Sequence, residues 1–397
     1  MATMTDGAVT AITPLLTFDD IVGAAREKTG GLPDPDVDSW QEGLHMLLHD
    51  HAKLDLLSER GKAIMKRRYS DALATRMKVD DYMRRNPTVA QTKIEAPVFI
   101  LGIVRSGTTL TSHMMGADPA NRSLLRWEAY NVVPPAAPGA LRTDPRCLAE
   151  KKVDEEILRT NPKGAATHFE PADGPTECVN MLAQDFRSMM FTAMLSVPTY
   201  ADWVLFCDQT TSYEHRKRVF QILQTTNQGR WVLKMPSDSV FIPYIFKVFP
   251  DARVIWTHRD PFAASASSFS MRSQSRTIFQ KDVDLPYMQS RWPIQLGLHC
   301  RRPMELARER GDAIYNLYYD DLVADPLASM RKVYGWLGWD WNAATQDGMA
   351  RWLAENPQNR FGKHDYSLAQ WGFSRKDLEP YFADYLRAYP VATGKEA

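Results

Sequence analysis

The stretch APVFILGIVRSGTTLTSHMM, residues 96–115, decides the fold. An apolar strand enters a loop bounded by Gly102 and Gly107, and the chain leaves this loop as a helix that begins at Thr108. Two glycines with four residues between them have the spacing of a phosphate-binding loop, although threonine stands where nucleotide-binding P-loops carry lysine. Such a loop and the helix N-terminus direct backbone N–H groups at an anion. The sequence therefore predicts an anion site with Arg105 as its positive charge, in preference to a turn whose glycines only relieve strain.

Downstream of this loop, apolar strands alternate with helical stretches. Such alternation predicts right-handed crossovers and a mostly parallel sheet with helices on both faces. The fold class is therefore α/β with three layers, and a ligand should bind at the carboxyl ends of the strands. The predicted strand and helix pairs are 98–101 with 108–115, 231–234 with 240–249, 253–258 with 262–271, and 313–319 with 327–337.

The rest of the chain divides into a helical extension and an insertion. Residues 17–92 carry apolar side chains at intervals of three and four, which is typical of amphipathic helices, with Thr17 as the first helix cap. We expect residues 1–95 to form an N-terminal helical extension and residues 96–397 to form the α/β domain. Between Pro134 and Thr211 the pattern is poorer and richer in proline, which predicts an irregular and helical insertion that we place at residues 130–215.

The composition excludes several classes of protein. Lysine plus arginine and aspartate plus glutamate both number 48, so no overall field would attract nucleic acid or an anionic membrane, and an anion site must be local. The four cysteines stand far apart, without the spacing of a disulfide framework or a metal site, which favours reduced thiols. No signal peptide and no apolar run of roughly 18 residues is present, so we expect a soluble, cytoplasmic protein without a metal.

A second segment, WTHRDPFAASASSFS at residues 256–270, ends a predicted strand at Arg259 and places Ser267 eight residues later. Together with the R-S-G-T-T of residues 105–109, this pair resembles the sulfotransferase family, in particular the branch of tyrosylprotein sulfotransferases and many bacterial soluble enzymes. The resemblance extends from about Pro97 to Tyr389. It implies transfer of a sulfuryl group from 3'-phosphoadenosine 5'-phosphosulfate (PAPS) to a hydroxyl acceptor, without a metal.

The resemblance also implies which residues hold the donor. Arg259 and Ser267 would bind the 3'-phosphate, since a guanidinium forms bidentate charge-assisted bonds and a hydroxyl completes the cage. A surface ion pair between Arg259 and Asp260 is the alternative. The phosphosulfate would lie on the first loop, where Arg105 also stabilises charge on the sulfuryl group. The loop residues in this role are Arg105, Ser106, Gly107, Thr108 and Thr109.

Further residues match the family pattern. Lys234, at the end of a predicted strand, would contact the phosphosulfate and stabilise the departing phosphate, unless it is only solvated. Tyr319 in YYDDL would lie near the adenosine or the 3'-phosphate, or else end a core strand. Lys363 and His364 in FGKHDYS would be loop contacts to the donor, although an exposed turn has the same pattern. Relatives often carry histidine where this chain has Asp238, whose role the sequence leaves open.

An acceptor hydroxyl near pH 7 needs a general base. The family places a glutamate after the first helix, and Glu128 in WEAYNVVPP matches that position. His168 is the alternative base, and Glu170 and Glu177 are further candidates in the same region. Positioning and electrostatics would account for the rest of an in-line transfer, as they do in phosphoryl transfer.

Two other functions compete with this interpretation. A P-loop small-molecule kinase shares the strand, loop and helix, but it would carry the loop lysine and lack the Arg259 and Ser267 pair. A non-catalytic nucleotide-binding protein of the same fold would bind the donor without transfer. The insertion at 130–215 should build the acceptor pocket, and its apolar side chains predict an apolar alcohol, phenol or lipid, unless they pack in the core. These side chains are Tyr130, Phe169, Met181, Phe186, Met189, Met190 and Phe191.

Overall fold

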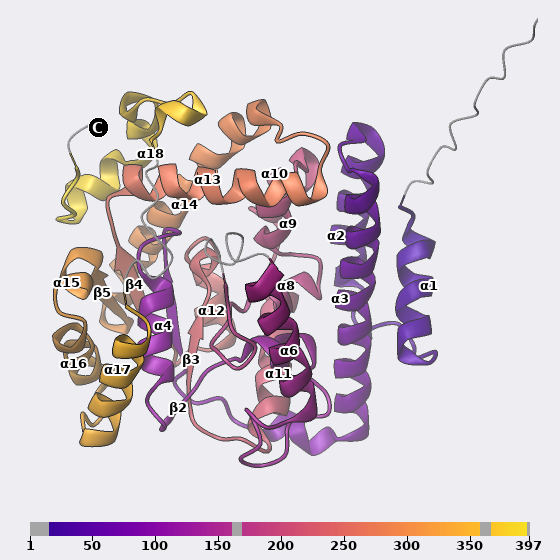
Figure 1. Ribbon diagram of the computed structural model, residues 1–397, viewed down its shortest axis with the longest axis horizontal. Coiled ribbons are helices and arrows are strands. Elements are labelled where there is room, and N and C mark those ends of the chain that lie inside the picture. The colour runs from indigo at the N-terminus through magenta and orange to yellow at the C-terminus, as the bar shows by residue number, and fades with distance from the viewer. Residues whose placement is uncertain (1–15, 161–168, 358–366, 395–397) are drawn as a thin grey trace, which may run out of the picture.

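The computed structural model describes residues 16–160, 169–357 and 367–394. Its centre is a five-stranded sheet in the order β2-β3-β1-β4-β5, and every neighbouring pair of strands is parallel. This arrangement confirms the predicted parallel α/β sheet (Figure 1). The strands are β1 (Val98–Gly102), β2 (Asn121–Arg122), β3 (Arg230–Lys234), β4 (Arg253–His258) and β5 (Ile314–Tyr318).

Helices cover both faces of the sheet. Successive side chains of a strand point to opposite faces, so a strand covered on both sides is apolar throughout. On β1, Phe99 and Leu101 pack with α11, α12, α13, α14 and α18, whereas Val98 and Ile100 pack with α4, α16 and α17. The flanking helices are α4 (Thr108–Gly116), α11 (Thr210–Gln224), α12 (Ile242–Val248), α13 (Pro261–Phe279), α14 (Leu285–Arg310), α15 (Tyr319–Ala324), α16 (Pro326–Leu337), α17 (Ala343–Glu355) and α18 (Arg375–Ala388).

The helices that follow β3 and β4 differ from their predicted ranges. After β3 the chain forms a 3₁₀ turn, η2 (Pro236–Ser239), before α12, and Pro243 occupies the first turn of α12, where proline is tolerated. Helix α13 continues to Phe279, beyond its predicted end at residue 271. Helix α14 has no predicted counterpart, because Pro293 and Pro303 within it are residues that normally end a helix.

The N-terminal extension forms three helices that stand together at the right of Figure 1. They are α1 (Phe18–Thr29), α2 (Ser39–Leu54) and α3 (Glu59–Arg85), followed by a 3₁₀ turn, η1 (Pro87–Gln91). Thr17 caps α1 as predicted, since its hydroxyl oxygen accepts a hydrogen bond from the Asp20 amide at 3.1 Å. Within the described residues, neither these nor the other helices are long and apolar enough to cross a membrane.

A second hydrophobic core joins the extension to the insertion. Side chains of α1, α2 and α3 pack there with side chains of α9 and α10. Phe186 and Phe191 belong to this core, and Met181 and Met189 belong to the core against the sheet, so core packing accounts for these four predicted acceptor residues. Helix α5 (Arg126–Tyr130) leads into the insertion, whose own helices include α6 (Pro145–Thr160), α8 (Val179–Ala183), α9 (Met189–Met194) and α10 (Pro198–Val204).

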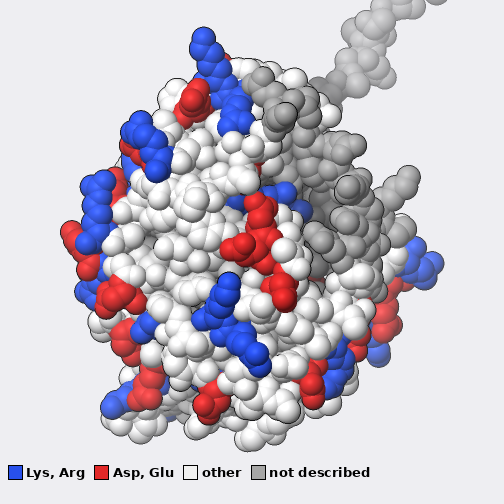
Figure 2. Space-filling view, turned by 90° about the vertical axis from the view of Figure 1, so that its left-hand side faces the viewer, with Lys and Arg blue, Asp and Glu red and all other residues white. Residues whose placement is uncertain are grey.

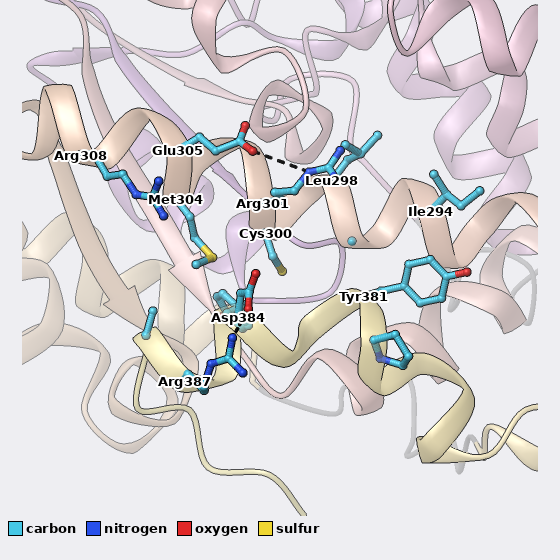
Figure 3. Close-up of a pocket in the computed structure, with 14 residues that line it drawn as sticks. Ile294, Leu298, Cys300, Arg301, Met304, Glu305, Arg308, Tyr381, Asp384 and Arg387 are labelled. Atoms are coloured by element: carbon cyan, nitrogen blue, oxygen red, sulfur yellow. Dashed lines mark hydrogen bonds and ion pairs between the residues drawn. The ribbon is translucent and has the colours of Figure 1, made fainter.

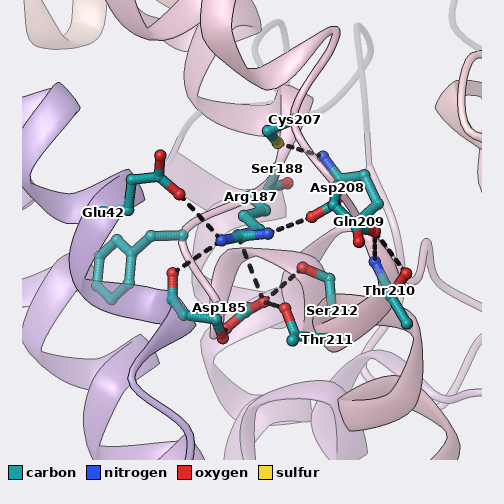
Figure 4. Close-up of polar contacts among 12 residues, drawn as sticks. Glu42, Asp185, Arg187, Ser188, Cys207, Asp208, Gln209, Thr210, Thr211 and Ser212 are labelled. Atoms are coloured by element: carbon teal, nitrogen blue, oxygen red, sulfur yellow. Dashed lines mark hydrogen bonds and ion pairs between the residues drawn. The ribbon is translucent and has the colours of Figure 1, made fainter.

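A buried carboxylate ties the same two parts together. Asp185 has no exposed surface and accepts hydrogen bonds from Arg76 of α3 at 2.6 Å and from Ser212 of α11 at 2.7 Å. Arg187 lies beside it and is paired with Glu42 of α2 at 3.1 Å (Figure 4). We call this set the Asp185 hub: Ser39, Glu42, Arg76, Asp185, Arg187, Thr211 and Ser212.

The far end of α13 abuts α3. The carbonyl oxygen of Phe279 accepts hydrogen bonds from the Ser58 amide at 3.0 Å and from the Ser58 hydroxyl at 3.2 Å. A Cβ at Gly61 would lie 1.8 Å from that carbonyl oxygen, so only glycine allows this approach. Helix α13 therefore begins at the carboxyl edge of the sheet and ends at the N-terminal helices.

Candidate active site

The predicted phosphate-binding loop begins where β1 ends, at Gly102, and leads into α4. Arg105 (φ 70°) and Gly107 (φ 95°) both have left-handed backbone conformations. Such a backbone turns successive N–H groups toward one point, and no side-chain cap among the described residues bonds the first turn of α4. A Cβ at Gly107 would lie 3.1 Å from the Tyr319 ring, which further requires glycine. The loop thus presents backbone donors to an anion.

The side chains of this loop divide into buried and accessible groups. Ser106 is fully buried, and its hydroxyl is hydrogen bonded to Thr257 Oγ1 of β4 at 2.5 Å. Thr108 is also buried, whereas Arg105 and Thr109 are exposed. Ser106 therefore holds the loop against β4, and Arg105 and Thr109 are accessible to a ligand.

The residues predicted to bind the 3'-phosphate come together with this loop. The Arg259 guanidinium donates to the backbone carbonyl of Arg105 at 2.6 Å and lies 4.2 Å from the centre of the Tyr319 ring. Arg105 Nε in turn donates to Ser267 Oγ at 3.3 Å. These four residues, Arg105, Arg259, Ser267 and Tyr319, come from three strand ends and one helix, and we call them the anion cradle. Within the described residues, neither arginine is ion-paired with a carboxylate.

The alternative interpretation of Arg259 finds no counterpart in the described residues. Asp260 does not pair with Arg259; its carboxylate accepts hydrogen bonds from the Phe262 amide at 2.9 Å and from the Gly394 amide at 3.0 Å. Asp260 is thus the cap of α13. This leaves the Arg259 guanidinium directed at the loop and at Tyr319.

Lys234 ends β3 at the same edge of the sheet and is not a solvated side chain. Its side chain is fully buried, and Nζ lies 3.1 Å from Glu170 Oε1 and 3.0 Å from Glu177 Oε1. Burial by itself would lower the pKa of this ammonium group, but the carboxylates of Glu177 and Glu170 outweigh burial and raise the pKa above its usual value. The ammonium is therefore charged and shared between two carboxylates.

Glu128 lies in a closed environment. Only 1% of its surface is exposed, and its carboxylate accepts from Arg122 at 2.5 Å and from the Leu125 amide at 3.3 Å. The contact with Leu125 caps the short helix α5. Arg126, the neighbour with which Glu128 might be expected to pair, is paired with Glu150 and Asp154 instead.

Asp238, whose role the sequence left open, has a structural environment. It is fully buried, and Arg216 Nη1 donates to it at 2.9 Å. Tyr213 also donates its hydroxyl to the same carboxylate. His168, Lys363 and His364 lie outside the described residues.

Sequence reasoning underrated the two glutamates on Lys234. Glu170 and Glu177 are 64 and 57 residues away from Lys234 along the chain, so no local pattern links them. In the structure, the backbone of Glu177 in the segment PTEC forms an isolated parallel β-bridge with Lys234 of β3. A buried lysine at a strand end requires a carboxylate partner, and this rule would have directed the search.

One groove of the described residues lies away from these side chains. It lies between α14 and α18, has a volume of about 690 Å³ and is lined by residues such as Ile294, Arg301 and Tyr381 (Figure 3). No residue of the anion cradle lines it. We therefore place the candidate site at the carboxyl edge of the sheet, on the chemistry of its side chains rather than on cavity size.

The charged side chains on the surface are mixed in sign, unlike the two arginines of the anion cradle. Figure 2 shows acidic and basic side chains interspersed over the face that carries α15 and α16, without a field of one sign. This agrees with 48 basic and 48 acidic residues in the chain. An anion would therefore be attracted by local groups.

Comparison with known proteins identifies the fold and the family. The profile of the sulfotransferase family matches residues 97–343, which include β1, the loop, Lys234, Arg259, Ser267 and Tyr319. The chain belongs to the sulfotransferase family. Two solved mycobacterial sulfotransferases share its structure. The crystal structure of STF9 from Mycobacterium avium is 34% identical, with a TM-score of 0.89, and the match covers 98% of this chain and 99% of that one.

The second solved sulfotransferase and a curated relative are more distant. The crystal structure of STF1 from Mycobacterium tuberculosis H37Rv is 26% identical with a TM-score of 0.81, and the match covers 93% of this chain and 99% of that one. The omega-hydroxy-beta-dihydromenaquinone-9 sulfotransferase Stf3 of Mycobacterium bovis is 24% identical over 259 residues, or 63% of this chain. The chain spans 65% of the length of that relative.

Proposed function

We propose that this chain transfers a sulfuryl group from PAPS to a hydroxyl acceptor by in-line displacement. The observation that carries the proposal is the anion cradle. Arg105 and Arg259 stand side by side at the carboxyl edge of the sheet, in contact with Ser267 and Tyr319. Two guanidiniums without a carboxylate among the described residues suit a ligand with phosphate groups at both ends of a nucleoside.

Each part of the donor has a matching group. The 3'-phosphate would accept from Arg259 and Ser267, and the adenosine would lie near Tyr319. The phosphosulfate would accept from the loop amides and from Arg105, with Lys234 behind it. A kinase would need the loop lysine, and here Thr108 occupies that position and is buried.

The acceptor hydroxyl needs a general base, and we rank the candidates Glu128, Glu170 and Glu177 by how exposed each side chain is. The carboxylate of Glu128 is enclosed by Arg122 and α5, so we assign it a structural role. The side chains of Glu170 and Glu177 are 14% and 25% exposed, and both contact Lys234. We propose Glu177, the more exposed of the two, as the group that takes the acceptor proton.

The Lys234 cluster supports the transfer as a unit. One ammonium between two carboxylates carries a net charge of −1. When the ammonium turns toward the departing phosphate, it stabilises charge there, and a carboxylate that it releases becomes more basic. A single lysine thus links leaving-group stabilisation to proton uptake.

The acceptor is proposed to be an apolar alcohol. The curated relative is named for a hydroxylated menaquinone, a lipid-like alcohol, which favours an apolar hydroxyl compound here as well. Tyr130 is 47% exposed in the insertion and is the clearest candidate to contact it, since most other predicted acceptor residues are buried in the two cores.

The experiment that tests the function is a binding comparison followed by an assay. We expect 3'-phosphoadenosine 5'-phosphate to raise the melting temperature, and ATP with Mg²⁺ to leave it unchanged, because the cradle binds a 3'-phosphate. Label from PAPS should then pass to an apolar alcohol in the presence of EDTA. Stabilisation by ATP with Mg²⁺ alone would support the kinase, and donor binding without transfer to any alcohol or phenol would support a non-catalytic protein.

A further inference from the structure

A polar seam lies between α13 and α14, behind the candidate site. On α13, Ser268, Arg272 and Arg276 are spaced by four residues and so share one face. On α14, Trp292, Gln295 and His299 share the opposing face. Arg272 Nη1 donates to Gln295 Oε1 at 3.1 Å, and the two guanidiniums lie 4.7 and 4.8 Å from the centre of a Trp292 ring. We call these six residues the α13–α14 seam.

The seam holds two buried positive charges without an ion pair in the described residues. Arg272 is 4% exposed and Arg276 is fully buried, yet neither has a carboxylate within ion-pair distance. Other buried arginines differ, because Arg76 is paired with Asp185, and Arg216 with Asp238. A buried cation is normally paired, since its desolvation is costly.

Backbone oxygens offset part of one charge. Arg276 donates to the carbonyl oxygens of Thr192, Ala193 and Leu195, at the C-terminal end of α9. Among the described residues, Arg272 donates to the neutral amide of Gln295 and stacks on Trp292, and no carboxylate or backbone carbonyl accepts from it. Burial, and for Arg272 also the charge of Arg276, lowers the pKa of both arginines to about 10. The seam therefore lacks negative charge at Arg272.

The seam also has a surplus of donors. The unpaired buried atoms are Ser268 Oγ, Arg272 Nε, Arg276 Nε, Trp292 Nε1, Gln295 Nε2 and His299 Nε2. The nitrogens of arginine, tryptophan and the amide donate only. A water molecule would bring two hydrogens of its own into this set of donors, whereas an anion accepts from several donors and balances the charge.

We propose that the α13–α14 seam binds a small monovalent inorganic anion, with chloride as the natural occupant, through the donors of Ser268, Arg272, Trp292 and Gln295. The site is distinct from the donor site and does not depend on the proposed reaction. It is nevertheless close to it, because His299 Nδ1 lies 3.2 Å from the Gly102 carbonyl oxygen and 2.6 Å from Ser239 Oγ. A bound anion would hold α13 and α14 together behind the phosphate-binding loop.

The first test is diffraction from crystals of the full chain grown or soaked in sodium bromide. At the bromine absorption edge we expect an anomalous peak within the seam, at the edge of the Arg272 guanidinium where Nε is unpaired. Thermal unfolding is measured in parallel at constant ionic strength while chloride replaces gluconate. We expect a saturable rise in melting temperature of about 2 °C.

Two variants identify the site. Arg272→Met should lose the response to chloride, while Arg253→Met, at an arginine that stacks on Trp336 at the other end of β4, should keep it. Gln295→Glu places a carboxylate 3.1 Å from the Arg272 guanidinium, so the variant should be stable in gluconate and indifferent to chloride. If Arg272→Met does not fold, the response of the Gln295→Glu melting temperature to chloride still tests the proposal. Equal melting temperatures of the wild type in gluconate and chloride, or bromide peaks only on the surface, would overturn the proposal.

Discussion

The anion cradle and the Asp185 hub use the same side chains in opposite ways. In the hub, Arg76 and Arg187 are buried and meet carboxylates, and Asp185 accepts from hydroxyls as well. In the cradle, Arg105 and Arg259 are more accessible, and within the described part of the chain their side chains meet a carbonyl, a hydroxyl and a ring but no carboxylate. An arginine satisfied within the protein supports the fold, while one left without negative charge suits an anionic ligand. The comparison predicts different losses on substitution.

The largest loss is expected in the hub. Asp185→Asn leaves Arg76 buried without its carboxylate and should lower the free energy of unfolding by about 3–5 kcal/mol. The measurement is urea unfolding followed by circular dichroism. Asp202→Asn is the control, because its pair with Arg291 is at the surface and should contribute less than about 1 kcal/mol. Equal losses in the two variants would contradict the role of the hub.

The hub also shows where sequence reasoning ended. The strand, loop and helix around Gly107 are contiguous, and their glycines and apolar run are sufficient to predict them. Arg259, Ser267 and Tyr319 of the cradle were indicated by the resemblance to the sulfotransferase family, and parallel strands bring their carboxyl ends to one edge. The hub joins Asp185 to Arg76 across 109 residues, and no pattern in either segment indicates the other. Helix α14 was not predicted for a different reason. Pro293 and Pro303 disfavour a helix locally, but the helix forms because its side chains pack against the rest of the protein.

The next largest effect distinguishes Glu177, the proposed general base, from Glu128, the proposed structural residue. Glu177→Gln should lower single-turnover transfer by roughly 10²-fold, the usual contribution of a general base, and leave the affinity for 3'-phosphoadenosine 5'-phosphate nearly intact. Glu128→Gln should instead lower the free energy of unfolding by about 1–3 kcal/mol, with turnover per folded molecule retained. The opposite result would return the base to Glu128. Glu170→Gln, measured alongside, distinguishes the two partners of Lys234.

The cradle itself should show a loss of affinity without a loss of stability. Arg259→Ala removes a charge-assisted contact to the ligand, so the affinity for 3'-phosphoadenosine 5'-phosphate should fall by about 10- to 100-fold in calorimetry. Arg253→Ala, at the opposite end of β4, should leave that affinity unchanged. Unaltered binding by the Arg259 variant would remove this residue from the site.

The smallest expected effect concerns a single hydroxyl. Ser267→Ala should weaken binding of 3'-phosphoadenosine 5'-phosphate by about 3- to 10-fold, since one neutral donor is lost. Binding of adenosine 5'-phosphosulfate, which has no 3'-phosphate, should not change. Ser265 on the same helix is the control, because its hydroxyl already donates to the Pro261 carbonyl at 2.6 Å. A loss of both ligands in the Ser267 variant would point to a general distortion of α13.

Helix α13 gives these local effects a longer range. It has 19 residues and is therefore about 28 Å long, with Ser267 near its start and Phe279 at its end. The Phe279 carbonyl rests on Ser58 and crosses Gly61 without room for a side chain. A chain shortened to the α/β domain would therefore lose the contacts of Ser58 and Gly61 with the C-terminal end of α13. The same helix carries the Ser267 hydroxyl at the proposed donor site. The N-terminal helices thereby help to position Ser267 of the proposed donor site, although none of their residues needs to touch the ligand.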